Sequence, residues 1–468
     1  MNALIILLSL IVFGGAAFMA PAQAPGAFAL CIATTLPALV ILARTEADRT
    51  FLIRVLILGV LVRIVVASVI FAGGFEEFFG GDALTYDIFG KSLAASWHGD
   101  TYHLGRYQDF VASGASAWGM LYIFAAVYEI VGENLFAVQL INAALGASTA
   151  IVVYYTAQSL FNNRRVSRLT ALLVGFFPSL VLWSAQALKD GLIVLVLALA
   201  IFATLKLMDK ISVFYIVLLA TCLLSLLTLR FYVFYMMVAA VAGSFVMGMK
   251  GGSMQTFMRK FVVIVALGMA FTWFGVIRYA GSQIDKYANL QMLQTSRMDQ
   301  AQSAESGFGK DVDIQTTEGA LQVIPLGLMY LLFAPFPWQL ASLRQLITLP
   351  EMLIWWVSFP LLVLGLWYAI KHRLREVSPI VMFTTMLTLV YSIFQGNVGT
   401  AYRQRSQLLV FYFIFVAVGA VMVKERREDR DRELQKAKKD LAELQAARVL
   451  ARRRPGDLQG SQPIAGPS

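Results

Sequence analysis

The chain has 468 residues, of which 59% are hydrophobic and only 14% are charged, and its formal net charge is +10. Soluble globular chains carry about 25% charged residues, and one or two domain cores cannot bury this much apolar surface. Apolar segments of roughly 18 residues or more, long enough for a ~30 Å hydrocarbon core, recur along the whole chain. The composition therefore excludes a soluble domain and predicts an all-α polytopic membrane protein.

The first segment, "MNALIILLSLIVFGGAAFMAPAQA", ends like a signal-peptidase site but has no basic residues before its apolar run. Because many apolar segments follow, we predict that it is a retained transmembrane helix. Cys31 and Cys222 both lie inside apolar segments. Neither a disulfide framework nor a cysteine metal site is therefore predicted.

The apolar pattern predicts about 12 transmembrane helices. Their ranges are 2–20, 27–44, 51–72, 134–160, 167–185, 190–208, 211–229, 231–249, 261–279, 351–370, 379–395 and 406–423. The segment 320–335 is also apolar enough to cross the membrane, which would raise the number of transmembrane helices from 12 to 13. However, the proline-containing stretch "PFPWQ" follows it. We interpret 320–350 as a re-entrant or interfacial hairpin, whose irregular backbone must face protein or water.

Lysine and arginine residues in short loops predict the orientation of these helices. Loops rich in Lys and Arg alternate along the chain with loops that are not. All of the basic loops lie on the cytoplasmic face if the N-terminus is cytoplasmic. An even number of crossings then places the C-terminus on the same face. The predicted organisation is two extra N-terminal helices in 1–50, a transmembrane core in 51–423, and a charged helix with a disordered tail in 424–468.

Two long loops lie on the noncytoplasmic face in this topology. Residues 73–133 include the amphipathic segment "AWGMLYIFAAVYEIVG", which predicts a helix along the membrane surface. Residues 280–319 are polar and have few large apolar side chains, so we expect a mobile loop that becomes ordered when substrate binds. No internal repeat is visible, which gives no support to an inverted-repeat transporter.

The segment 424–454 contains 12 Lys and Arg and 7 Asp and Glu residues. Leu434, Ala437, Leu441 and Leu444 recur at heptad spacing, but two heptads are too few to predict a coiled coil. We interpret the segment as a solvated helix attracted to anionic lipid. Nucleic-acid binding is not predicted, because the excess positive charge belongs to loops next to a membrane.

The stretch "GGDALTYDIFGKSLA", residues 80–94, places Asp82, Tyr86 and Asp87 directly after an apolar helix. Asp is favoured at helix N-caps, so Asp82 has a structural interpretation as a cap. Its functional interpretation is a general base at the edge of a cavity, and a capping carboxylate can serve both purposes. Asp87 and Lys91 are one helical turn apart and predict a surface ion pair.

Four basic residues lie at the noncytoplasmic ends of predicted helices: Lys189, Arg230, Arg403 and Arg405. Basic residues at such positions often anchor a helix at the membrane interface. Arg230 fits this explanation least well, because it is the only charge between residues 211 and 249. His98 and His103 lie near Asp100 and Asp109, but this arrangement is too weak to predict a metal site, and no cofactor is predicted.

The pattern Asp82-x-x-x-Tyr86 followed by "GKSLA" resembles the first outer loop of the GT-C glycosyltransferases. These polytopic enzymes, which include the protein O-mannosyltransferases and the lipid A aminoarabinose transferases, move a sugar from a polyprenyl-phosphate carrier to an acceptor. The resemblance covers roughly residues 75–210 and continues through "GENLFAVQLINAALGASTAIVVYYTAQSLF" and "WSAQALKDGL". The chain differs in having Ala83 where relatives often have Glu, and in its two extra N-terminal helices.

The resemblance implies a GT-C-like bundle and transfer of a sugar with inversion on the noncytoplasmic face of a bacterial inner membrane. The partners it implies are a polyprenyl-phosphate-linked sugar, a glycan, lipid or protein acceptor, and membrane lipids. Asp82 would be the general base, and Tyr86, Asp87, Lys189, Arg230, Arg403 and Arg405 would bind substrate. One alternative is an O-antigen or exopolysaccharide polymerase or ligase that depends on arginines and a histidine. The other is a transporter or flippase of lipid-linked sugar.

Overall fold

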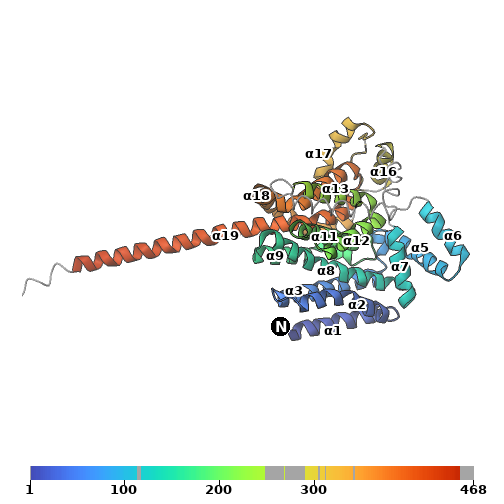
Figure 1. Ribbon diagram of the computed structural model, residues 1–468, viewed down its shortest axis with the longest axis horizontal. Helices are drawn as coiled ribbons and strands as arrows, with labels where there is room; N and C mark the ends of the chain where they lie inside the picture. Colours follow the sequence, from blue (N-terminus) through green and yellow to red (C-terminus); the bar gives the residue numbers. More distant parts are fainter. Residues whose placement is uncertain are drawn as a thin grey trace, which may run out of the picture.

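Helices account for the regular structure of the described residues (Figure 1), apart from one isolated bridge between Gly307 and Asn397. The computed structural model describes residues 2–112, 118–247, 268, 290–303, 306–310, 312–340 and 343–453. The helices are α1 (Asn2–Met19), α2 (Ala24–Ala43), α3 (Arg49–Gly73), α4 (Glu76–Phe79), α5 (Asp82–Trp97), α6 (Thr101–Ala112), α7 (Trp118–Val131), α8 (Leu135–Phe161), α9 (Arg164–Phe176), α10 (Pro178–Ser184), α11 (Lys189–Asp209), α12 (Val213–Leu229), α13 (Phe231–Met247), α16 (Leu290–Ser303), α17 (Thr317–Phe333), α18 (Leu343–Phe394) and α19 (Val398–Arg453).

Six of the described helices are long and apolar enough to cross a membrane: α2, α3, α8, α11, α18 and α19. The pair α9 and α10 would be a seventh span if it is counted as one, and several further apolar helices are shorter. The predicted all-α membrane class is therefore confirmed, whereas these helices do not establish a number near 12. The predicted span 261–279 lies outside the described residues except for Gly268.

One predicted span is broken in the structure, and two others adjoin each other at a kink. The predicted helix 167–185 is broken into α9 and α10, which meet at 52°. Pro178 explains the break, because proline has no N–H to continue the helical hydrogen bonds and forces Phe177 into an extended conformation. The predicted helices 351–370 and 379–395 lie in the two helices that share the label α18, which meet at a kink where Arg373 leaves helical geometry.

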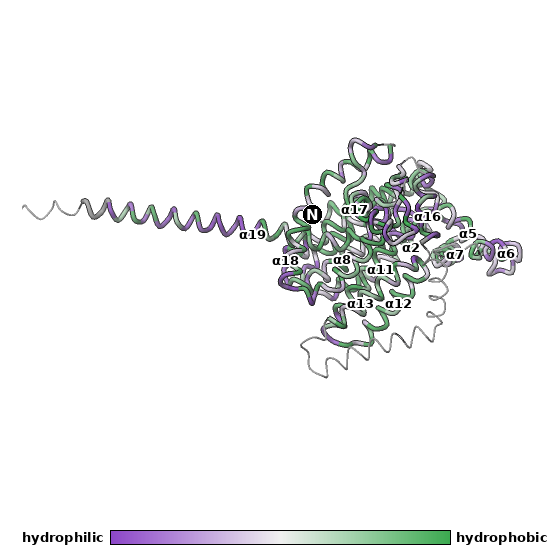
Figure 2. Tube along the Cα trace, turned by 90° about the horizontal axis from the view of Figure 1, so that it is seen from above, coloured by the Kyte–Doolittle hydropathy of each residue, from purple (hydrophilic) through white to green (hydrophobic). Residues whose placement is uncertain are grey.

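Helix α8 lies at the centre of the bundle and packs against α2, α3, α9 and α11. Its small residues Ala143, Ala144, Gly146 and Ala147 are fully or almost fully buried, which lets neighbouring helix backbones approach closely. Figure 2 shows that hydrophobic residues dominate this part of the molecule. The close packing fixes the helix ends, which carry the charged residues of the candidate site.

The two ends of the bundle have different structures. Helices α5, α6 and α7 lie at the end of the bundle opposite to the projecting part of α19 (Figure 1), so loop 73–133 contains helices, as predicted. Part of the second long loop is helical as α16. At the opposite end, α19 continues without interruption from the last apolar segment into the charged tail. Arg165 of α9 contacts α19 where it leaves the bundle, and its Nη1 lies 2.8 Å from Glu428 Oε2.

A buried carboxylate joins three helices at the end of the bundle from which α19 projects. Asp48, between α2 and α3, accepts hydrogen bonds from Arg164 and Arg168 of α9 and from the hydroxyl of Tyr154, the last at 2.7 Å. The Asp48 side chain has no exposed surface. The Arg164 guanidinium, supported by Arg168 and Tyr154, holds the pKa of Asp48 well below its usual range, although burial alone would raise it.

We expect Asp48→Asn to lower the free energy of unfolding by about 2–3 kcal/mol, less than is usual for a buried pair because the two guanidinium groups are partly hydrated. Because the pKa is lower in the folded than in the unfolded protein, the stabilisation is complete above about pH 5 and is lost as the pH falls below ~4. Thermal unfolding in detergent from pH 3 to pH 8 measures both effects. An unchanged melting temperature for Asp48→Asn at pH 7 would contradict the prediction, and exposed Asp100→Asn is the control.

Candidate active site at the α5 end of the bundle

Charged residues from four separate parts of the chain meet at the α5 end of the bundle. Arg403 of α19 is their centre: its Nη1 lies 2.9 Å from Asp82 Oδ2, and its Nε donates to Asp190 Oδ2 at 2.7 Å. The other oxygen of Asp190 accepts from Arg230 Nη2 at 3.4 Å. We call Asp82, Asp190, Arg230 and Arg403 the Asp82 cluster. It joins positions up to 321 residues apart in the sequence.

Exposure changes steadily across the Asp82 cluster. The Asp190 side chain has no exposed surface, Arg230 and Arg403 are 7% and 14% exposed, and Asp82 is 50% exposed. Asp82 is therefore the member that a molecule arriving from solvent or the membrane surface can reach first. Asp190, the fully buried member, accepts hydrogen bonds from both guanidinium groups and so orients them.

Lys189 and Tyr86 form a buried side of the same region. The Lys189 Nζ lies 5.8 Å from the centre of the Tyr86 ring, close enough for a cation–π contact. Burial raises the pKa of Tyr86, and the nearby Asp82 carboxylate adds to this effect, so its hydroxyl stays protonated. Lys189, Arg230 and Arg403 place three basic groups beside the two carboxylates of Asp82 and Asp190. The two arginines offer N–H donors that an anionic group could bind.

The predicted capping role of Asp82 is wrong. Gly81 occupies the N-cap of α5 and has no side chain, while Asp82 lies in the first helical turn. An acidic residue there is still favoured by the positive end of the helix dipole. Gly80 makes the preceding bend at a φ of +149°, which is readily adopted by glycine. The local sequence thus points the Asp82 carboxylate outward from the start of a helix and leaves it free to meet Arg403.

Arg230 lies at the break between α12 and α13, where the chain leaves helical geometry for one residue. Its side chain is buried against Asp190, and its guanidinium lies 5.9 Å from the centre of the Tyr232 ring. Interface anchoring requires a basic group that reaches water or lipid headgroups. Arg230 is instead part of an internal charge cluster.

Two of the predicted substrate-binding residues have their contacts elsewhere. Arg405 is 1% exposed and donates from Nη1 to the carbonyl of Leu332 at 2.9 Å, at the C-terminal end of α17. It thereby satisfies a helix-end carbonyl, a structural task. Asp87 accepts a hydrogen bond from Tyr128 and lies 3.0 Å from Lys91 Nζ, which confirms the predicted ion pair.

The two candidate histidines each contact a carboxylate. His98 Nε2 lies 2.9 Å from Glu129, and His103 Nδ1 lies 2.7 Å from Asp100. Among the residues that the structure describes, no three His, Cys, Asp or Glu side chains gather in a way that could hold a metal ion. These histidines belong to the α5–α7 surface.

Two buried residues of the region were not selected from the sequence. Asp190 is adjacent to Lys189 in the turn "QALKDG", yet only the lysine was chosen there as a candidate. Arg63 lies in the interior of α3, and a charge within an apolar segment of this length is a recognised signal of function. The signal that singles out Arg230 in its apolar segment is therefore present at Arg63 as well.

The fold and the site define a polytopic membrane protein with a charged, partly open cluster at one end of its helix bundle. Residues 116–275 match the family model described as dolichyl-phosphate-mannose-protein mannosyltransferase, a family of the GT-C superfamily. This confirms the resemblance predicted from the sequence and indicates a membrane glycosyltransferase of the GT-C type. The matched segment, about a third of the chain, contains Lys189, Asp190 and Arg230, while Asp82 and Arg403 lie outside it. No curated protein gives a significant match.

Proposed function

We propose that the protein transfers a sugar from a polyprenyl-phosphate carrier to an acceptor hydroxyl, with Asp82 as the general base. The observation that supports this most directly is the arrangement of Arg403, which joins the half-exposed Asp82 to the buried Asp190. A base and a phosphate-binding cation are thereby held next to each other. A displacement at an anomeric carbon requires both groups, a base on the side of the acceptor and a cation on the side of the phosphate, so the contact between Asp82 and Arg403 must open when the carrier phosphate binds.

In the proposed reaction the acceptor oxygen forms a bond to the anomeric carbon as the bond from that carbon to the phosphate oxygen breaks. The electron pair leaves with the carrier phosphate, and the acceptor proton moves to Asp82. The leaving phosphate needs no protonation, because Lys189, Arg230 and Arg403 stabilise the charge that develops on it. A single displacement of this kind inverts the configuration. The acceptor is a glycan, a lipid or a protein, and Tyr86 would form part of the wall of the site.

The direct test is sugar transfer by the purified protein in nanodiscs. Polyprenyl-phosphate sugars carrying a labelled sugar are supplied with candidate acceptors, and both labelled product and released polyprenyl phosphate are measured. Equal amounts of the two products would support transfer. Movement of intact carrier across the membrane without its cleavage would replace the proposal with a flippase.

Arg230→Ala should weaken binding of polyprenyl monophosphate more than Arg230→Lys, because a guanidinium can hold phosphate through two hydrogen bonds while an ammonium supplies charge alone. The expected losses of affinity are on the order of 100-fold and 10-fold. Titration of nanodisc-embedded protein with the lipid measures both. Normal affinity in Arg230→Ala would limit this residue to a structural role beside Asp190.

The proposed topology places the α5 end of the bundle on the noncytoplasmic face and both termini in the cytoplasm. Single cysteines at 100–108 or 399–400 should react with an impermeant thiol reagent in intact cells, and those at 162–165 or 371–376 should not. The native Cys31 and Cys222 are buried and give little background. Labelling of 371–376 from outside would contradict the proposed cytoplasmic location of these residues. It would indicate instead that 320–335 crosses the membrane completely.

A further inference from the structure

Arg63 is a buried charge that the proposed reaction does not use. It lies in the interior of α3, is 1% exposed, and would be costly to retain in a membrane helix without a purpose. Its Nε donates to Ser184 Oγ at 2.7 Å, and its Nη1 donates to the carbonyls of Gly175 at 2.8 Å and Gly59 at 3.0 Å. One guanidinium thus connects α3 with α9 and α10.

One acceptor of Arg63, the carbonyl of Gly175, is available because α9 and α10 are separate helices. The carbonyl of Gly175 would normally accept from the backbone four residues later, but the break at Phe177 and Pro178 removes that partner. Arg63 supplies the replacement donor. The guanidinium therefore stabilises the break itself, and with it the direction in which α10 leads to α11.

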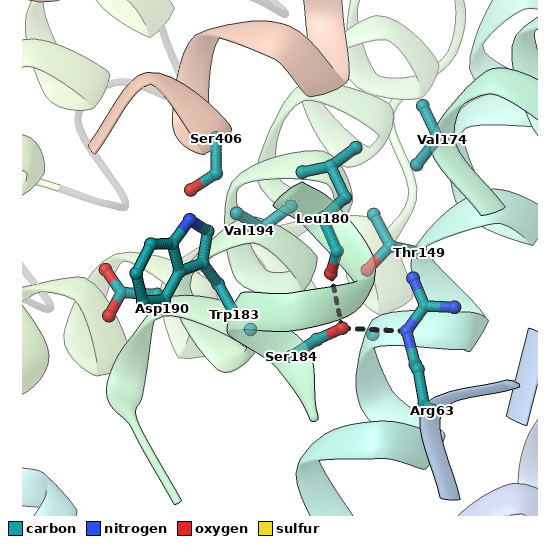
Figure 3. Close-up of a pocket in the computed structure, with 11 residues that line it drawn as sticks. Arg63, Thr149, Val174, Leu180, Trp183, Ser184, Asp190, Val194 and Ser406 are labelled. Carbon is teal, nitrogen blue, oxygen red and sulfur yellow. Dashed lines mark hydrogen bonds between the residues drawn. The ribbon is translucent and has the colours of Figure 1, made fainter. Parts of the chain in front are cut away.

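Ser184, the last residue of α10, is held tightly from two sides. A Cβ added at Gly146 of α8 would lie 2.3 Å from the Ser184 Cβ, and one added at Gly191 of α11 would lie 2.9 Å from it. Both glycines are therefore required for the close approach of these helices. Figure 3 shows Ser184 hydrogen-bonded to Arg63 beside a small cavity that Asp190 also lines.

Asn142 of α8 holds the rest of the connection between α10 and α11, residues 185–188. Its buried Nδ2 donates to the carbonyl of Gln186 at 2.8 Å and to that of Leu188 at 2.7 Å. The four residues of this connection are buried, so water cannot easily replace these bonds. Lys189 and Asp190 follow immediately as the first residues of α11.

We infer that Arg63 and Asn142 are positioning residues, which fix the α10–α11 connection so that Asp190 is aimed at Arg403 and Arg230. Among the residues that the structure describes, neither side chain forms a hydrogen bond or an ion pair with a member of the Asp82 cluster, so their effect passes through the backbone of the connection. If the connection loosens, Asp190 shifts, and both guanidinium groups lose the acceptor that orients them. The consequence for a bound phosphate rests on the proposed function, whereas the positioning of Asp190 does not.

Hydrogen–deuterium exchange of the full-length protein in detergent tests the positioning directly. Arg63→Met and Asn142→Leu keep side-chain size but remove the donors. In both variants the amides of 185–190 should exchange about 10-fold faster, while those of α13 stay unchanged.

Thr170→Val, which removes a buried hydroxyl bonded only to its own helix, is the matched control. Ser184→Ala removes a single acceptor of Arg63 and replaces Arg63→Met if that variant does not fold. Unchanged exchange in the variants would overturn the inference.

Binding of polyprenyl monophosphate then tests whether the effect passes through Asp190. Arg63→Met should raise the dissociation constant about 10-fold in the wild-type background and less than about 2-fold in an Asp190→Asn background, because residues that act through a shared partner are not additive. Equal increases of the dissociation constant in both backgrounds would mean that Arg63 contributes only to the overall stability of the protein, and would overturn the inference. If the wild-type protein does not bind the lipid, the proposed function fails, and the exchange experiment alone decides the role of Arg63 and Asn142.

Discussion

Asp82→Asn should lower the rate of sugar transfer by ~10²–10⁴-fold, the usual contribution of a positioned general base. Asparagine keeps the shape of the side chain but cannot accept the proton of the attacking hydroxyl. Folding should be little affected, because Asp82 is half exposed and an ion pair of this kind contributes little to stability. Carrier binding should be retained or improved, since Arg403 loses a carboxylate that competes with phosphate for its Nη1. Initial rates, lipid affinity and melting temperature together measure these effects.

Asp87→Asn is the control for this experiment. Asp87 lies on the same helix, but its partners are Tyr128 and Lys91, away from Arg403. It should therefore cost stability more than it costs turnover. Normal turnover by Asp82→Asn would end the assignment of Asp82 as the base. A similar loss in both variants, with lower melting temperatures, would mean that the carboxylates only maintain the α5 region.

Arg403→Ala should abolish detectable binding of polyprenyl monophosphate or weaken it by on the order of 100-fold or more. The substitution removes a cation from the proposed phosphate site and leaves buried Asp190 with Arg230 as its remaining cluster partner. Because an incompletely paired buried carboxylate is costly, the melting temperature should also fall. Arg403→Lys should fall between these limits, since one ammonium cannot span Asp82 and Asp190 as the guanidinium does.

Arg405→Lys separates the two effects of Arg403→Ala. Arg405 is two residues away on the same helix and is also buried, but it donates to the end of α17. Its substitution should reduce thermal stability with lipid affinity unchanged. If both arginine substitutions weaken lipid binding in proportion to their loss of stability, Arg403 is a structural residue and the phosphate site must be sought elsewhere.

Arginines 403 and 405 also show why sequence alone could not complete the site. The sequence predicts a helix that begins at residue 406, so Arg403 and Arg405 both precede it, and both are predicted to bind substrate. In the structure α19 already begins at Val398, and residues two apart on a helix point in directions about 200° apart. Only one of the two can therefore face Asp82. The error concerned the start of a helix, which is the feature that local sequence defines least well.

The sequence by itself determined the class of the protein, most of the long helices, and the presence of candidate charges at helix ends. These properties follow from hydrophobicity and short-range pattern, which a membrane makes unusually strict because every buried backbone group must be paired within its own helix. The resemblance carried by residues 75–210 added the reaction class, which the family match supports.

Only the tertiary structure decided which charges meet. Asp82, Asp190, Arg230 and Arg403 come from four separate parts of the chain, and their contact depends on how α8 packs its neighbours and on where α10 ends. The same packing made Asp190 the partner of both arginines and gave Arg63 and Asn142 their acceptors across helix boundaries. Such contacts depend on distances between helices that are remote in sequence, and no local pattern of apolar and charged residues encodes those distances.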